Sequence, residues 1–148
     1  MKKILCFIMS MALSINICNQ LTSACSPEAI LNDMRCPRST ADCLCEAVCR
    51  CDYDLVKYII DNEKDCDVNQ RDYMGDLPLY AAVLLSNDKY KVEEAKKIVD
   101  LLLEHGADPN LTHKKGISAL DLFTMADRSC FNEIFAKHGF VVPEYRKH

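Results

Sequence analysis

At 148 residues the chain is long enough for one ordinary domain, and no more should be expected. Its 18 basic and 22 acidic residues give a net charge of −4, which excludes the strongly basic surface that binds nucleic acids or anionic lipid head groups. Neither partner is therefore expected.

Residues 1–24 have the layout of a bacterial-type secretory signal. Lys2 and Lys3 precede an almost uncharged apolar run from Ile4 to Ile17, which is too short to span a bilayer as a mature helix, and small residues follow at 22–24. Removing this segment removes two lysines and no acid, so the net charge becomes −6. We predict a protein that is exported to the periplasm or secreted, with no transmembrane span in the mature chain.

The residues around the cleavage point leave a second mode of export open. The stretch LTSAC (21–25) resembles a lipoprotein signal, in which the cysteine carries a lipid. Thr22 departs from that pattern, because a large apolar residue is usual three positions before the cysteine. A lipid anchor at Cys25, holding the protein at a membrane surface, is therefore the alternative to ordinary cleavage after Ala24.

The first helices are expected between residues 25 and 60. The stretch SPE (26–28) combines a side-chain cap, a proline at the first helical position and an acid in the first turn, which predicts a short helix to about Met34. This helix would lie in an N-terminal cap segment, residues 25–41. Apolar residues at 44, 47 and 48, followed by LVKYII (55–60), align by spacing with the two helices of the later repeats, so a pair of helices is expected here as well.

The middle of the chain predicts a second and longer helix pair. GDLPLYAA (75–82) predicts a turn followed by a helix, and Val92, Ala95, Val99 and Leu102 fall on one face of the next helix. We expect a turn at residues 87–88 before this helix and its end at Gly106.

Equivalent residues recur at a constant distance, which divides the rest of the chain. Gly75 to Gly116 and Asn69 to Asn110 are both 41 residues, and GISALDL (116–122) and IFAKHG (134–139) repeat the start and end of the central pair. The repeats are therefore expected at about 42–74, 75–115 and 116–142, followed by a tail at 143–148. The central repeat, at 41 residues, is longer than the 33-residue period of the repeat family named in the next paragraph, and we expect its extra residues at about 86–97.

The stretches GDLPLYAA and LLLEHGADPN (101–110) resemble the ankyrin repeat, whose signature is T-P-L-H-x-A. The resemblance implies an all-α solenoid of about three helix-turn-helix repeats with hairpin-like tips. It also implies a non-enzymatic scaffold that binds another protein, with no cofactor, through the turn tips and the concave face of the first helices. No catalytic, phosphate-binding or calcium-binding motif is found. The partner-binding positions that the resemblance assigns are Glu46, Tyr73, Met74, Asp76, Ala81, Leu84, Lys114, Lys115, Ile117 and Leu122.

Four cysteines lie in CLCEAVCRC (43–51), and eight lie beyond residue 24. Export favours disulfides over metal, and four cysteines on one helix cannot all converge on one ion. By the resemblance, Cys45 stands at the family's histidine position and Cys51 at the usual glycine between the helices. We expect Cys130, on the order of 20 Å from the cluster, to be unpaired. The expected disulfide-forming residues, which would fasten the first repeat to its cap, are Cys36, Cys43, Cys45, Cys49, Cys51 and Cys66. The alternative is a metal-binding or thiol-redox module at 43–51.

Overall fold

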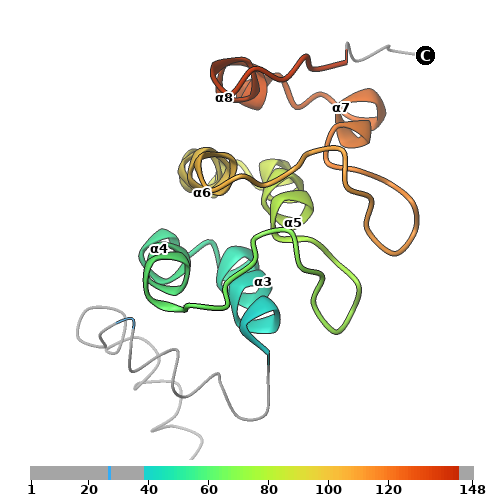
Figure 1. Cartoon of the computed structure of the whole chain (residues 1–148). Helices are drawn as coiled ribbons and strands as arrows, with labels where there is room; N and C mark the ends of the chain where they lie inside the picture. The colour runs from blue at the N-terminus through green and yellow to red at the C-terminus, as the bar shows by residue number, and fades with distance from the viewer. Residues whose placement is uncertain (1–26, 28–38, 144–148) are drawn as a thin grey trace, which may run out of the picture.

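The protein is described by a computed structural model that places residue 27 and residues 39–143. Within this part of the chain, helices follow one another as antiparallel pairs, and the pairs stack in series (Figure 1). The elements are α3 (Thr40–Arg50), α4 (Tyr53–Asn62), α5 (Pro78–Leu84), the 3₁₀ turn η2 (Leu85–Asn87), α6 (Val92–Glu104), α7 (Asp121–Met125), the 3₁₀ turn η3 (Ser129–Phe131) and α8 (Asn132–Lys137).

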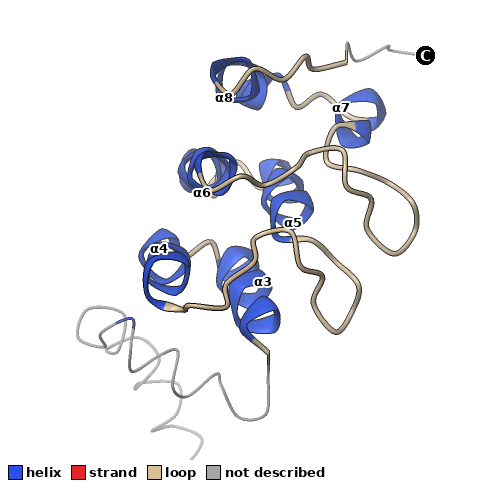
Figure 2. Cartoon of the chain, in the orientation of Figure 1, coloured by secondary structure: helices blue, strands red, loops and turns tan. Residues whose placement is uncertain are grey.

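The predicted all-α stack is confirmed for these residues. Figure 2 shows helices and loops only, and the extended pairing is limited to an isolated bridge between Thr112 and Ser118. None of the described helices is both long enough and apolar enough to cross a membrane. The predicted signal segment, lipidation at Cys25, and most of the cap segment with Cys36 lie outside the described residues.

The first helix pair is defined by side-chain caps and by one unusual backbone conformation. Ser39 and Asp42 form a reciprocal capping box at the start of α3, with bonds of 3.0 and 3.2 Å. The helix ends at Arg50, and the following Cys51 has a left-handed φ of 61°, a conformation that usually selects glycine. Asp52 then caps α4 by accepting a hydrogen bond from the Leu55 amide (3.0 Å). The glycine-like position assigned to Cys51 therefore has the geometry that the alignment implied.

The central pair holds the extra residues between its two helices, as expected. Pro78 occupies the first turn of α5, where its missing amide hydrogen is not needed. The excess length forms η2 and a loop to Lys91, and α6 then runs for 13 residues, with Ala95, Val99 and Leu102 buried on one face.

The core is a continuous apolar layer between the first helices (α3, α5, α7) and the second helices (α4, α6, α8) of the pairs, which form the two columns of Figure 1. Its fully buried side chains include Leu44, Val56, Val83, Leu102 and Phe135. In the last pair, the Phe123 and Phe135 rings meet edge to face at 5.1 Å. Because each pair buries its apolar face against the next, removing one pair would expose the core of its neighbour.

Contacts between successive loops fasten the stack at the end of the first helices opposite the tips. The Cys51 thiol lies 3.6 Å from the Lys91 carbonyl oxygen, which joins the first and central pairs. Arg128, which is buried, donates from Nη1 to the Val83 carbonyl oxygen at 3.0 Å and to Asn87 Oδ1 at 3.4 Å. The long central loop thus contacts both neighbouring pairs.

Candidate protein-binding surface

The turn between α4 and α5, residues 71–76, is called the first tip. Asp72 builds it: its Oδ1 accepts hydrogen bonds from the amides of Met74 (2.9 Å) and Asp76 (2.8 Å), and its backbone pairs with Gly75 and Asp76. The Tyr73 amide donates to Asp42 Oδ1 at 2.7 Å, which ties the tip to the start of α3. With the backbone fixed in this way, the Tyr73 and Met74 side chains face solvent, 79% and 50% exposed.

The turn between α6 and α7, residues 112–117, is called the second tip. His113 is buried at its base, where its amide and its Nδ1 each lie 2.9 Å from the Ile117 carbonyl oxygen. The Tyr80 ring stacks on the His113 ring at 4.2 Å, so α5 of the preceding repeat supports this tip. Lys114 and Lys115, at its apex, are exposed.

The two tips contact each other directly. The Lys114 amide donates to the Gly75 carbonyl oxygen at 3.0 Å, and Arg71 Nη2 donates to the Thr112 carbonyl oxygen at 2.6 Å. The Cβ of Lys114 lies so close to Gly75 that a Cβ added there would be 2.9 Å from it. We call Tyr73, Met74, Lys114 and Lys115 together the tip surface; it spans two repeats and has a fixed backbone.

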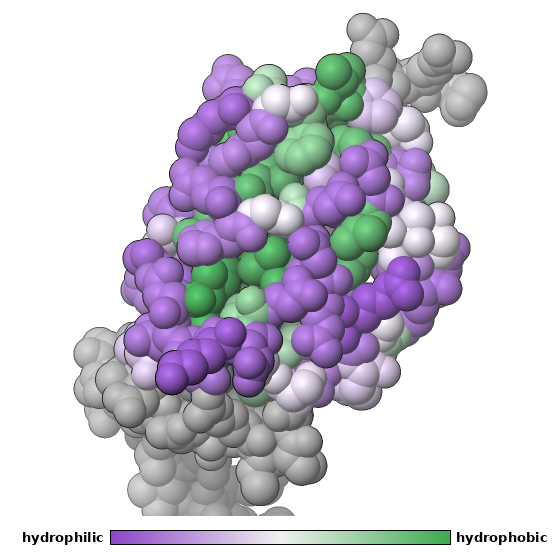
Figure 3. Space-filling model, viewed as in Figure 1, coloured by the Kyte–Doolittle hydropathy of each residue, from purple (hydrophilic) through white to green (hydrophobic). Residues whose placement is uncertain are grey.

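The other predicted binding positions are less exposed than the four residues of the tip surface. Asp76, Ala81, Leu84 and Ile117 are half-buried, and so is Glu46, which pairs with Arg50 at 2.6 Å. Figure 3 shows this end of the molecule as mostly hydrophilic, with a band of hydrophobic residues between the two columns of helices.

The expectation that Leu122 is exposed was wrong. Leu122 is only 4% exposed, because the short helix α7 turns both Leu122 and Phe123 into the core. Met125 was missed: it is 57% exposed and lies 41 residues after Leu84, so the constant repeat distance could have identified it.

The cysteines of 43–51 point in different directions. Cys43 is buried in the core, the Cys45 thiol lies 3.8 Å from the Asp76 carbonyl oxygen, Cys49 is exposed, and Cys51 faces Lys91. The structure therefore differs from the predicted pairing, since it contains Cys45, Cys49, Cys51, Cys66 and Cys130 as free thiols. Pairing in oxidised protein, including any bridge to Cys36, and the unpaired state of Cys130 stay predictions.

These thiols are in surroundings that disfavour the thiolate. Burial raises the pKa of Cys45 far above its usual value, and the carboxylates of Asp72 and Asp76 add to the effect. Burial also raises the pKa of Cys49, again with Asp72 and Asp76, and the pKa of Cys51. Because the thiolate is the nucleophile and the metal ligand, neither redox nor metal chemistry at 43–51 is favoured by this geometry.

One group of potential metal ligands comes together among the described residues: Asp100, Glu104 and His138. Its space is already taken by a cation of the chain. Lys137 Nζ lies 2.9 Å from both Asp100 oxygens and 3.2 Å from Glu104, while His138 Nε2 lies 2.7 Å from Asp100 Oδ1. Although burial raises the pKa of Asp100, the hydrogen bonds from Lys137 and His138 outweigh it and hold that pKa below its usual value. The group therefore fastens α8 to α6.

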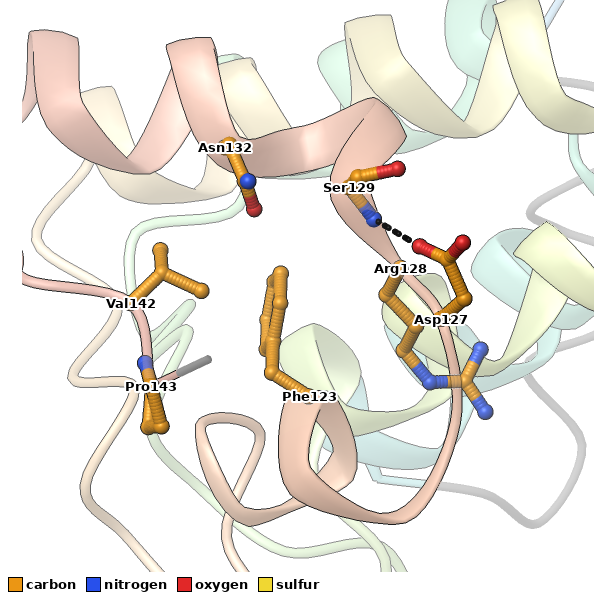
Figure 4. A pocket seen from close by; sticks show the side chains of 7 residues that line it. All are labelled: Phe123, Asp127, Arg128, Ser129, Asn132, Val142 and Pro143. Atoms are coloured by element: carbon orange, nitrogen blue, oxygen red, sulfur yellow. Dashed lines mark hydrogen bonds between the residues drawn. The ribbon is translucent and has the colours of Figure 1, made fainter. Parts of the chain in front are cut away.

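A small pocket of about 270 Å³ lies in the last repeat (Figure 4). Phe123 and Asn132 point into it, and the Ser129 amide donates to Asp127 at 3.1 Å on its rim. The Arg128 guanidinium is turned away from Phe123 and Asn132 and is engaged with the central repeat. No nucleophile and base meet among the described lining residues, which are Phe123, Asp127, Arg128, Ser129, Asn132, Val142 and Pro143.

Comparison with known proteins gives a consistent result. The family model described as "Ankyrin repeats (3 copies)" matches residues 8–113, well over half of the chain. A putative ankyrin repeat protein of Escherichia coli K12, YahD, is 43% identical over 58 residues, which are 39% of this chain and 27% of that protein.

Two solved structures extend the likeness. An ankyrin repeat domain from Acinetobacter baumannii AYE superposes with a TM-score of 0.55 and 29% identity, covering 65% of this chain and 46% of that one. The ankyrin repeat protein EF0377 superposes with a TM-score of 0.54 and 25% identity, covering 64% and 45%. The chain thus matches about a quarter of that curated relative and under half of each solved structure.

Proposed function

The chain belongs to the ankyrin repeat family, and from that premise we propose that it is a non-catalytic protein-binding module that acts outside the cytoplasm and engages its partner through the tip surface. Ankyrin repeats indicate a protein-protein interaction module. The observation that carries the proposal for this chain is the exposure of Tyr73 and Met74 on a backbone whose amides are hydrogen-bonded to Asp42 and Asp72. Aromatic residues and methionine are enriched at interface centres, and a fixed backbone reduces the entropy lost on binding.

Action outside the cytoplasm rests on the secretory layout of residues 1–24. Cell fractionation combined with the N-terminal mass of the purified protein tests it. We expect a chain that begins at or near Cys25, with or without a lipid. A cytosolic protein that retains Met1 would refute this part of the proposal and leave the binding module in place.

Binding through the first tip can be tested with a matched aromatic control. Tyr90 is 85% exposed, but it lies in the loop between α5 and α6, away from the tips. A photoreactive amino acid at position 73 should cross-link a partner in the exported fraction, and the same amino acid at position 90 should not.

The captured partner then allows affinity to be measured. Replacing Tyr73 and Met74 together by alanine should weaken binding by more than about 1 kcal/mol, or roughly fivefold, because truncating central interface residues has this effect. Tyr90→Ala should leave the affinity unchanged, and both variants should keep the wild-type helical signal. Unchanged binding by the double variant would show that the tip surface is not the binding site.

A further inference from the structure

The lysines of the second helices are neutralised within the chain. Lys57 pairs with Asp61 at 2.8 Å, Lys96 with Glu93 at 2.8 Å and Lys97 with Glu94 at 2.9 Å. Lys137 pairs with Asp100 and Glu104. Every lysine of α4, α6 and α8 therefore has a carboxylate partner.

The lysines of the tip surface have no such carboxylate partner among the described residues. Within residues 39–143, no carboxylate lies at ion-pairing distance from Lys114 or Lys115, although the chain as a whole is acidic. Arg71, beside them, donates to the Thr112 carbonyl oxygen and forms an ion pair with none of the described acids. Three cations thus gather at the tips, and none of them has an acidic partner in the part of the chain that the structure describes.

Three of the acids near the tips accept hydrogen bonds from the chain itself. Asp72 accepts hydrogen bonds from two amides of the first tip, and Asp42 accepts from the amides of Ser39 and Tyr73. Asp121 accepts from the amide and hydroxyl of Ser118, and the first of these bonds lowers the pKa of Asp121. Asp76 is half-buried beside Cys45 and Cys49 on the first-helix side. The carboxylates of Asp42, Asp72 and Asp121 thus accept hydrogen bonds within the chain, whereas Lys114 and Lys115 are exposed.

The apolar and basic parts of the surface lie side by side. Met74 is followed by Gly75, whose carbonyl oxygen receives the Lys114 amide, so the two tips adjoin in register. The Lys114 amide nitrogen lies 3.0 Å from the Gly75 carbonyl oxygen, so the backbones of the two tips are in direct contact. An extended segment rises about 3.3 Å per residue, so a short segment can contact both tips at once.

We propose that the tip surface binds an acidic segment of a protein partner, with an aromatic or large aliphatic residue against Tyr73 and Met74 and neighbouring carboxylates of the segment against Lys114 and Lys115. This inference rests on the proposed function and names the chemistry of its partner. A nucleic acid fits less well, because phosphate-backbone binding commonly uses 6–10 contacts and the tips carry three cations in an acidic chain.

The test selects peptides from a random display library of about a dozen positions per peptide on the immobilised full mature chain. Fluorescein-labelled copies of the most enriched peptides are then titrated and followed by anisotropy. The test variant is K114Q/K115Q, which keeps the Lys114 Cβ against Gly75. The control variant is K64Q/K89Q, which removes the same total charge from exposed loop lysines outside the tips.

We expect the selected peptides to be enriched in aspartate and glutamate near one large apolar residue. K114Q/K115Q should weaken their binding about tenfold, as two exposed ion pairs would, and K64Q/K89Q less than about twofold. Replacing the peptide's acids by their amides should reproduce the tenfold loss, and added salt should weaken binding by the wild type more than by K114Q/K115Q.

Other outcomes overturn the inference in distinguishable ways. Peptides that need Tyr73 and Met74 but are not acidic would refute the partner chemistry and leave the proposed function standing. Equal losses in the two lysine variants would reveal non-specific attraction. Tighter binding of a labelled oligothymidine than of the selected peptides would identify the wrong class of macromolecule. A selection without any peptide that depends on Tyr73 and Met74 would count against both the inference and the proposed function.

Discussion

Replacing Gly75 by alanine should destabilise the fold in two separable ways. The φ of Gly75 is +80°, a left-handed conformation that costs other L-residues about 1–2 kcal/mol. Alanine also restricts the unfolded chain, which offsets about 0.4–1 kcal/mol of that cost. In addition, the new Cβ would lie 2.9 Å from Lys114 Cβ, and overpacking of this kind typically costs about 1–3 kcal/mol. We expect a total loss of about 2–4 kcal/mol.

Gly116 is a matched control in the second tip. Its φ is +76°, nearly that of Gly75, but a Cβ added there has no heavy atom within 4 Å apart from those of Gly116 and its two chain neighbours. Gly116→Ala should therefore cost about 1 kcal/mol, the backbone part alone. The free energy of unfolding is obtained from urea titrations of the full chain under reducing conditions, followed by far-ultraviolet circular dichroism.

A second background isolates the contact between the tips. In Lys114→Gly the opposing Cβ is absent, so Gly75→Ala should there cost no more than Gly116→Ala. Equal costs for Gly75→Ala and Gly116→Ala in the wild-type background would refute the packing of one tip against the other. So would an undiminished cost of Gly75→Ala in the Lys114→Gly background.

Two further predictions concern the first repeat and the last. Cys51 has a φ of 61°, so Cys51→Gly should be as stable as the wild type or up to about 1 kcal/mol more stable, and Cys51→Val should be about 1–2 kcal/mol less stable. Urea titration measures both differences. A valine variant as stable as the wild type would contradict the left-handed backbone. Asp100→Asn should cost about 1 kcal/mol or less near neutral pH. Because the folded-state pKa of Asp100 is depressed, the extra stability of the wild type should be complete above the unfolded pKa of about 3.9 and should be lost as the pH falls through the lower folded value. The thermal unfolding curves of the two proteins should therefore converge on acidification. A stability difference that does not change with pH would contradict the ion pair.

The sequence predicts the helices well because their signals are local. Apolar spacing, the turn before each first helix and the constant 41-residue distance place the helix pairs to within a few residues. Cys51 shows that alignment can also predict a backbone conformation, since it occupies a glycine position and adopts a positive φ.

The surface is less predictable because it depends on contacts between repeats. Lys57–Asp61 is a pair four residues apart that the sequence alone suggests, whereas Lys137–Asp100 joins residues 37 apart. The burial of Leu122 depends on how the short helix α7 packs against its neighbours. The directions of the four cysteines likewise follow from which repeat atoms they meet, and spacing on one helix does not fix them.

The contact between the tips links binding to folding. The Gly75–Lys114 bond sets the position of the lysines from the backbone of the preceding repeat, so a segment lying across both tips binds two repeats at once. A ligand that binds only the folded stack stabilises it by mass action, and in an array this short each repeat has at most two neighbours to support it. Gly75→Ala should therefore lower partner affinity although position 75 offers the partner no side chain. The loss should be larger for partners that need the lysines than for partners that need only Tyr73 and Met74, because the substitution displaces the second tip from the first.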